Sequence, residues 1–206
     1  MLSDDVVREI DILAHRMGTN RSNLVNRILA EHVSLTTPEQ QINDIFTALG
    51  ELISPYRELV PFFEPNTPTM SFKSCLEYKY RPTVRYEVEL YTVPQKNAAG
   101  TLSVIFRTQS AALIEAMTGF FRLWKNIEDA YLAPVSGARE YSLYDGKFVR
   151  TIAPADNISS RAAAEGISEY VKLFDVLMKR YISGNINAEG VALIYAENVA
   201  RGSITV

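Results

Sequence analysis

Residues 13–29 read Leu-Ala-His-Arg-Met-Gly-Thr-Asn-Arg-Ser-Asn-Leu-Val-Asn-Arg-Ile-Leu, and this stretch decides how the chain begins to fold. Upstream and into it, apolar residues recur at spacings of three and four, as in a helix with one apolar stripe: Val6, Ile10, Leu13 and Met17. Gly18 can end that helix in the left-handed conformation. Asn20 can cap a second helix, whose apolar side includes Leu24, Val25, Ile28 and Leu29. The sequence therefore predicts two helices joined by a short turn.

The apolar stripes of these two helices predict a partner chain. Two helices of about four turns cannot bury both stripes by themselves, and at this size a partner is usually required. We therefore expect a homodimer, or a higher even oligomer, with a dimer core that includes Ile10, Leu13, Leu24, Ile28 and Leu29.

The order Gly-Thr-Asn-Arg-Ser between two apolar-striped helices resembles the ribbon-helix-helix family of DNA-binding proteins, over residues 1–33. The resemblance implies a dimeric transcriptional regulator in which the start of the second helix clamps a DNA phosphate, here through Asn20, Arg21 and Ser22. The chemistry is reasonable without the resemblance, because a helix start exposes unpaired N–H groups and a partial positive charge. Arg16 and Arg27 are further candidates for contacts with the DNA backbone, with solvated surface charge as the alternative for both.

One part of the family pattern is almost absent from this sequence. In that family a short strand before the first helix pairs across the dimer and reads bases in the major groove. Counting back from Gly18, the strand would end near Leu2, so the sequence contains almost none of it. Either the true start lies upstream of Met1 or direct base readout has been lost, and we name no base-contacting residue. The alternative function is a protein-interaction or antitoxin-like module that keeps the helical dimer.

The whole chain predicts an α+β fold in three parts. They are a helix–turn–helix unit over 1–34, a connector helix and linker over 35–68, and a C-terminal domain over 69–206. Thr37, Pro38 and Gln40 predict the start of the connector helix, and a short helix follows over 55–63. In the C-terminal domain we expect an antiparallel sheet covered by two or three long helices. The strands are expected at 70–80, 83–93, 101–107, 140–144 and 147–152, with a loop at 95–100. The helices are expected at 110–131, 157–182 and 188–200, with a strand at 191–195 as the alternative for the last.

Composition limits the classes of function. The net charge is −3, so any surface that binds nucleic acid must be local. The lone Cys75 excludes an intramolecular disulfide and is expected as a buried, inert thiol in a strand. With no secretory leader and no apolar run of about 20 residues, we expect a cytoplasmic protein that does not enter a membrane. We find no catalytic motif and no metal-ligand spacing, and therefore expect no enzyme activity, no cofactor and no bound metal.

One stretch of the C-terminal domain mixes basic and aromatic residues, which could bind nucleic acid by charge and stacking. The residues are Lys73, Tyr78, Lys79, Tyr80, Arg81, Arg85 and Tyr86. Glu77, Glu87 and Glu89 dilute the charge, and tyrosines are ordinary strand residues, so an ordinary sheet surface is the favoured interpretation. A protein or a small molecule as the partner of this domain remains an open alternative.

Overall fold

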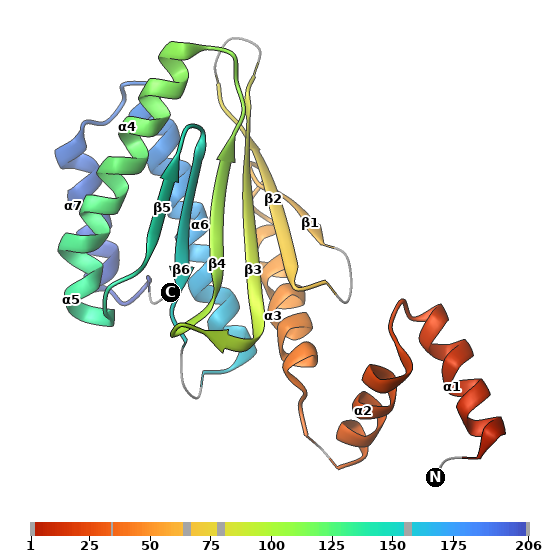
Figure 1. The fold of residues 1–206 in the computed structure, drawn as a ribbon. Helices are drawn as coiled ribbons and strands as arrows, with labels where there is room; N and C mark the ends of the chain where they lie inside the picture. Colours follow the sequence, from red (N-terminus) through yellow and green to blue (C-terminus); the bar gives the residue numbers. More distant parts are fainter. Residues whose placement is uncertain (1–2, 34, 64–66, 78–80, 155–157, 205–206) are drawn as a thin grey trace.

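The computed structural model describes residues 3–33, 35–63, 67–77, 81–154 and 158–204, which form an α+β fold (Figure 1). Its helices are α1 (Asp4–Arg16), α2 (Arg21–His32), α3 (Pro38–Ile53), α4 (Ala111–Ile127), the π-helical turn η1 (Glu128–Leu132), α5 (Ala133–Ser136), α6 (Ser160–Ile182) and α7 (Ala188–Ala200). Its strands are β1 (Val60–Phe63), β2 (Thr69–Cys75), β3 (Thr83–Gln95), β4 (Ala98–Phe106), β5 (Tyr141–Tyr144) and β6 (Lys147–Ile152).

The strands form one antiparallel sheet in the order β1-β2-β3-β4-β6-β5. Side chains alternate between its two faces, so Val84, Tyr86 and Val88 of β3 are buried while Arg85 and Glu89 are exposed. Helices α3 and α6 lie against the buried face, and α4 and α7 lie beside the β5 edge (Figure 1). The predicted antiparallel sheet with long covering helices is confirmed, and residues 188–200 are helical, as expected.

Two hairpin turns connect neighbouring strands of the sheet, one between β3 and β4 and one between β5 and β6. The β5–β6 turn lies at Asp145 and Gly146, between the strands expected at 140–144 and 147–152, and Gly146 has a φ of +70°. A Cβ there would lie 2.5 Å from the carbonyl oxygen of Phe106, so only glycine fits. The β3–β4 turn is tighter than the predicted loop over 95–100. Lys96 and Asn97 both have positive φ, 47° and 64°, which makes a two-residue turn and lets β4 begin at Ala98.

The segment expected to connect two domains contributes directly to the core of the second. Helix α3 packs against α6, and its buried side chains belong to the same apolar cluster as the sheet: Ile42, Ile45, Phe46, Leu49 and Ile53. The short helix expected over 55–63 is wrong, because β1 forms there and pairs with β2. The ring centroids of Phe46 in α3 and Phe63 in β1 lie 5.4 Å apart. Residues 35–63 therefore supply a helix and an edge strand to the C-terminal fold.

The core is centred on Phe174 in α6. Its ring centroid lies 4.7 Å from that of Trp124, 5.4 Å from that of Phe120 and 5.8 Å from that of Phe148. Each such aromatic pair adds about 0.5–1.5 kcal/mol beyond the burial of its area. Rings from α4, α6 and β6 thus hold the long helices against the sheet. Within the described residues, none of the helices combines the length and the apolarity needed to cross a bilayer.

Candidate nucleic-acid interface

The turn between α1 and α2 follows from the residues that end one helix and begin the next. Gly18 has a φ of +62°, and the N–H groups of Gly18 and Thr19 bond back into the last turn of α1, Thr19 to the Ala14 carbonyl at 2.9 Å. The Asn20 side chain accepts a hydrogen bond from the Asn23 N–H at 2.9 Å and caps α2. The predicted end of the first helix and cap of the second are both confirmed.

The residues expected to clamp a phosphate lie together at the exposed start of α2. The Asn20 side chain is used by the cap, so it offers an external anion only its NH₂ group. The N–H groups of Arg21 and Ser22 precede the first N–H that α2 bonds internally, which is that of Leu24 to the Asn20 carbonyl at 3.0 Å. These two N–H groups are therefore the backbone donors that an anion can engage at this helix start.

The guanidinium of Arg21 is engaged by an acidic residue of α1. Its Nε lies 2.6 Å from Oδ1 of Asp11, and its Nη2 lies 2.5 Å from Oδ2, which is a bidentate ion pair. The hydrogen bond from Arg21 lowers the pKa of the Asp11 carboxyl, and the same bond raises the pKa of Arg21. Both groups are therefore ionised at neutral pH. The positive charge at the start of α2 is balanced within the chain.

The two further arginines named from the sequence differ in their surroundings. Arg16 is exposed in the last turn of α1. Arg27 is half-buried, with Nη2 3.1 Å from the Met17 sulfur and Nε 4.0 Å from a Glu31 carboxylate oxygen. Arg27 thus packs back on the turn between the helices, whereas Arg16 is accessible to a partner.

The apolar side chains of α1 and α2 are only partly covered within one chain. Of the five residues expected in a dimer core, Leu24 is buried, at 2% exposure, and Ile10 is half-buried. The other three are exposed, with Leu13 at 38%, Ile28 at 42% and Leu29 at 58%. Further exposed apolar residues on this unit are Val6, Ile12 and Val33. His32, the last residue of α2, is also exposed in the single chain.

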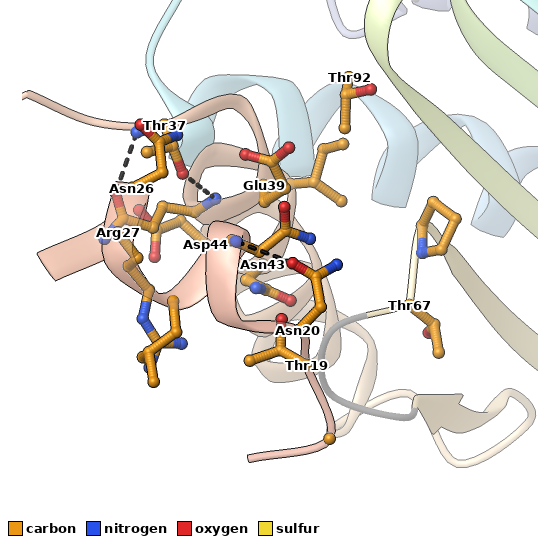
Figure 2. A pocket seen from close by; sticks show the side chains of 16 residues that line it. Thr19, Asn20, Asn26, Arg27, Thr37, Glu39, Asn43, Asp44, Thr67 and Thr92 are labelled. Atoms are coloured by element: carbon orange, nitrogen blue, oxygen red, sulfur yellow. Dashed lines mark hydrogen bonds between the residues drawn. The ribbon is translucent and has the colours of Figure 1, made fainter. Parts of the chain in front are cut away.

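A cavity of about 550 Å³ lies between the first half of α2 and the start of α3, and Thr67, Pro68 and Thr92 also line it (Figure 2). Most of its lining side chains are amides and hydroxyls, and it includes the carboxylates of Glu39 and Asp44. These carboxylates oppose the binding of an anion on this side of the α2 start. The sequence does not predict the cavity, because it depends on how α2 and α3 lie around the short segment between them.

The mixed basic and aromatic stretch does not form a stacking surface in the part of it that the structure describes. Tyr86 is fully buried and donates a hydrogen bond to Asp175 at 2.9 Å. Arg85 is paired with Glu87 on the exposed sheet face at 2.6 Å. Tyr78, Lys79 and Tyr80 lie outside the described residues. Cys75 ends β2 and is exposed, so the expectation of a buried thiol is wrong.

A buried polar cluster joins η1 to β6 and α7, and the sequence does not predict it. Glu128 and Arg150 form an ion pair at 3.2 Å, and Tyr195 donates to the same carboxylate oxygen at 3.1 Å. The Arg150 guanidinium also lies over the ring of Tyr170, 4.4 Å from its centroid. Burial and the Glu128 carboxylate raise the pKa of Tyr195, so the phenol stays protonated and donates. The cluster pairs two buried charges and links η1, β6 and α7 through one carboxylate oxygen of Glu128.

A second polar network lies where α6 meets the sheet. Asp175 accepts from Tyr86 and pairs with Lys179 at 2.7 Å, and Lys179 also pairs with Glu58 at 2.6 Å. Burial raises the pKa of Asp175. A buried acid with a shifted pKa can mark a catalytic site. Here the side chain is fully enclosed, and none of these residues lines the cavity in Figure 2.

Comparison of the chain with models of known protein families, with characterised proteins and with solved structures yields no match. The features that point to a function are therefore the residues at the start of α2 and the apolar surface of the helix pair. Sequence reasoning missed Asp11 as a member of this site, because it precedes Arg21 by 10 positions and lies on a different helix. The signal that could have identified Asp11 is its position on α1, because the short turn after α1 brings α2 back beside it.

Proposed function

We propose that the chain is a DNA-binding transcriptional regulator that acts as a dimer through α1 and α2 and clamps the DNA backbone with the start of α2. The observation that carries the proposal is the exposed helix start at Asn20, Arg21 and Ser22, where the backbone N–H groups of Arg21 and Ser22 precede the first internal bonds of α2. An anion at such a position is favoured by the N–H groups and by the helix dipole together. A net charge of −3 requires that the contact be local.

The dimer in this proposal is supported by the apolar residues that one chain leaves in water. Burying a leucine or isoleucine side chain contributes about 1.5–3 kcal/mol. Leu13, Ile28 and Leu29 are all more than one-third exposed, although they lie on short helices that bury few residues of their own. A second copy of the same helix pair offers a matching apolar surface, as isologous dimers require.

The experiment that tests the proposal is a titration of the purified chain against a duplex from its own upstream region, at two salt concentrations and with unrelated competitor DNA. We expect binding that weakens steeply as salt rises, because phosphate contacts release counterions. The substitutions Arg21→Gln and Ser22→Ala are expected to weaken binding while the dimer stays intact by light scattering. Unchanged affinity in both variants contradicts the clamp.

A second candidate function is a protein-interaction or antitoxin-like module, and one observation favours it. The Asp11 carboxylate neutralises Arg21, which lowers the attraction of the α2 start for phosphate. For such a module we expect a folded dimer that binds no duplex at low salt. The same titration therefore separates the two candidates.

A further inference from the structure

The ion pair between Asp11 and Arg21 has the geometry in which arginine binds phosphate. Two donors of one guanidinium, Nε and Nη2, each bond a separate oxygen of the same anion, at 2.6 and 2.5 Å. Carboxylate and phosphate are both recognised by arginine in this bidentate way. An anion of the chain itself therefore occupies the guanidinium donors with which Arg21 would bind a DNA phosphate at the start of α2.

The ion pair is exposed enough to exchange. The side chain of Arg21 is 51% exposed and that of Asp11 46% exposed. Ion pairs this accessible are held weakly, because water solvates both partners and salt screens them. The only other acidic residue of α1 for which the structure gives an arginine partner, among the described residues, is Asp5, whose contact to Arg8 is longer, at 3.8 Å.

We propose that Asp11 is an intramolecular competitor for the DNA phosphate at Arg21, and so sets how tightly the start of α2 holds DNA. The proposal rests on the proposed DNA-binding function. On binding, the guanidinium exchanges the Asp11 carboxylate for a phosphate, and the released carboxylate takes up water and a cation. This contact therefore contributes less to the free energy of DNA binding than the same contact from an unpaired arginine would. Asp11 is a residue that tunes affinity and does not touch DNA itself.

The test compares D11N with the matched variant D5N on a labelled mixed-sequence duplex at two salt concentrations. Both substitutions remove one negative charge from α1, but only D11N releases Arg21. We expect D11N to bind between about twofold and about thirtyfold more tightly than D5N, since an exposed pair contributes little and a dimer carries two copies. We also expect its affinity to fall more steeply with salt.

The substitution R21Q completes the experiment. In the R21Q background the D11N effect should disappear, because the residue that Asp11 competes for is absent. Equal affinities of D11N and D5N, with R21Q still weakening binding, overturn the inference and leave the proposed function standing. Weaker binding by D11N also overturns it, since Asp11 would then be positioning Arg21 for DNA. An absence of binding by the wild type and every variant, all folded and dimeric, overturns the inference and the proposed function together.

Discussion

The carboxylate of Glu128 and the guanidinium of Arg150 form an ion pair at 3.2 Å although their side chains are only 0% and 1% exposed. The pair is formed by the π-helical turn η1 and the strand β6, so it joins the segment that directly follows α4 to the second strand of the β5–β6 hairpin. Water cannot solvate either charge if its partner is lost. Loss of either partner therefore leaves a buried charge without its counter-charge.

Substituting Arg150 by methionine is expected to lower the free energy of unfolding by about 3–5 kcal/mol, because it leaves a buried carboxylate without its cation. The measurement is urea unfolding followed by circular dichroism. R85M is the matched control, since Arg85 pairs with Glu87 on the exposed sheet face and should change stability by at most about 1 kcal/mol. Equal losses in the two variants would show that burial of the pair is unimportant.

Asp175 is expected to make stability fall as pH rises. Burial raises its pKa above the ordinary value of 3.8, more than the hydrogen bond from Lys179 lowers it. The folded protein then holds this proton more tightly than the unfolded chain does, so the stabilisation is lost as pH rises from 3.8 through the folded pKa. The difference in unfolding free energy, D175N minus wild type, should therefore increase with pH over that window and then stay level. A difference that decreases with pH would mean that the ion pair with Lys179 outweighs burial.

Gly18→Ala is expected to destabilise the helix pair by about 1 kcal/mol, since alanine at a φ of +62° is strained. Gly119 provides the control, because it lies within α4 and a Cβ there meets no atom within 4 Å. G119A should raise stability by about 0.5–1 kcal/mol through its better helix propensity. Thermal unfolding of both variants measures the contrast. A G18A protein as stable as the wild type would mean that the turn at Gly18 adapts.

Leu29→Glu is expected to convert the proposed dimer to monomers, because it places a charge in the apolar surface of α2. Leu29 is 58% exposed in the single chain, and Leu193 of α7 is exposed to a similar extent, at 62%. L193E should leave the oligomeric state unchanged, since α7 lies outside the proposed interface. Sedimentation velocity at several concentrations gives the readout. An L29E protein that sediments as the wild type does would place the interface elsewhere.

The elements that sequence reasoning predicted well are those with a local cause. Gly18 and Asn20 define the turn between α1 and α2 through their own backbone and side-chain preferences. The alternation of Val84, Tyr86 and Val88 with charged neighbours predicts β3, and Asp145-Gly146 predicts the hairpin that follows α5. The residues of the proposed phosphate clamp are also consecutive, and their binding to DNA stays a prediction.

What the sequence did not predict depends on contacts between distant residues. Strand β1 contains Pro61, which suits only an edge strand, and it forms through its pairing with β2. Nothing in the sequence around Glu128 or Arg150 distinguishes either residue from a surface charge. Only the fold places the two side chains together in a buried environment. The pairing of Asp11 with Arg21 requires the angle between two helices, which no periodicity encodes.

The five residues between His32, which ends α2, and Pro38, which starts α3, have a consequence for assembly. An extended chain of this length reaches only about 17 Å. Since α3 is part of the C-terminal core, pairing of two helix units would tether two C-terminal bodies at an effective concentration in the millimolar range. A contact between these bodies that is too weak to form between free molecules would then be largely occupied. With so short a tether, even a weak contact between the two C-terminal bodies therefore helps to determine the final oligomer.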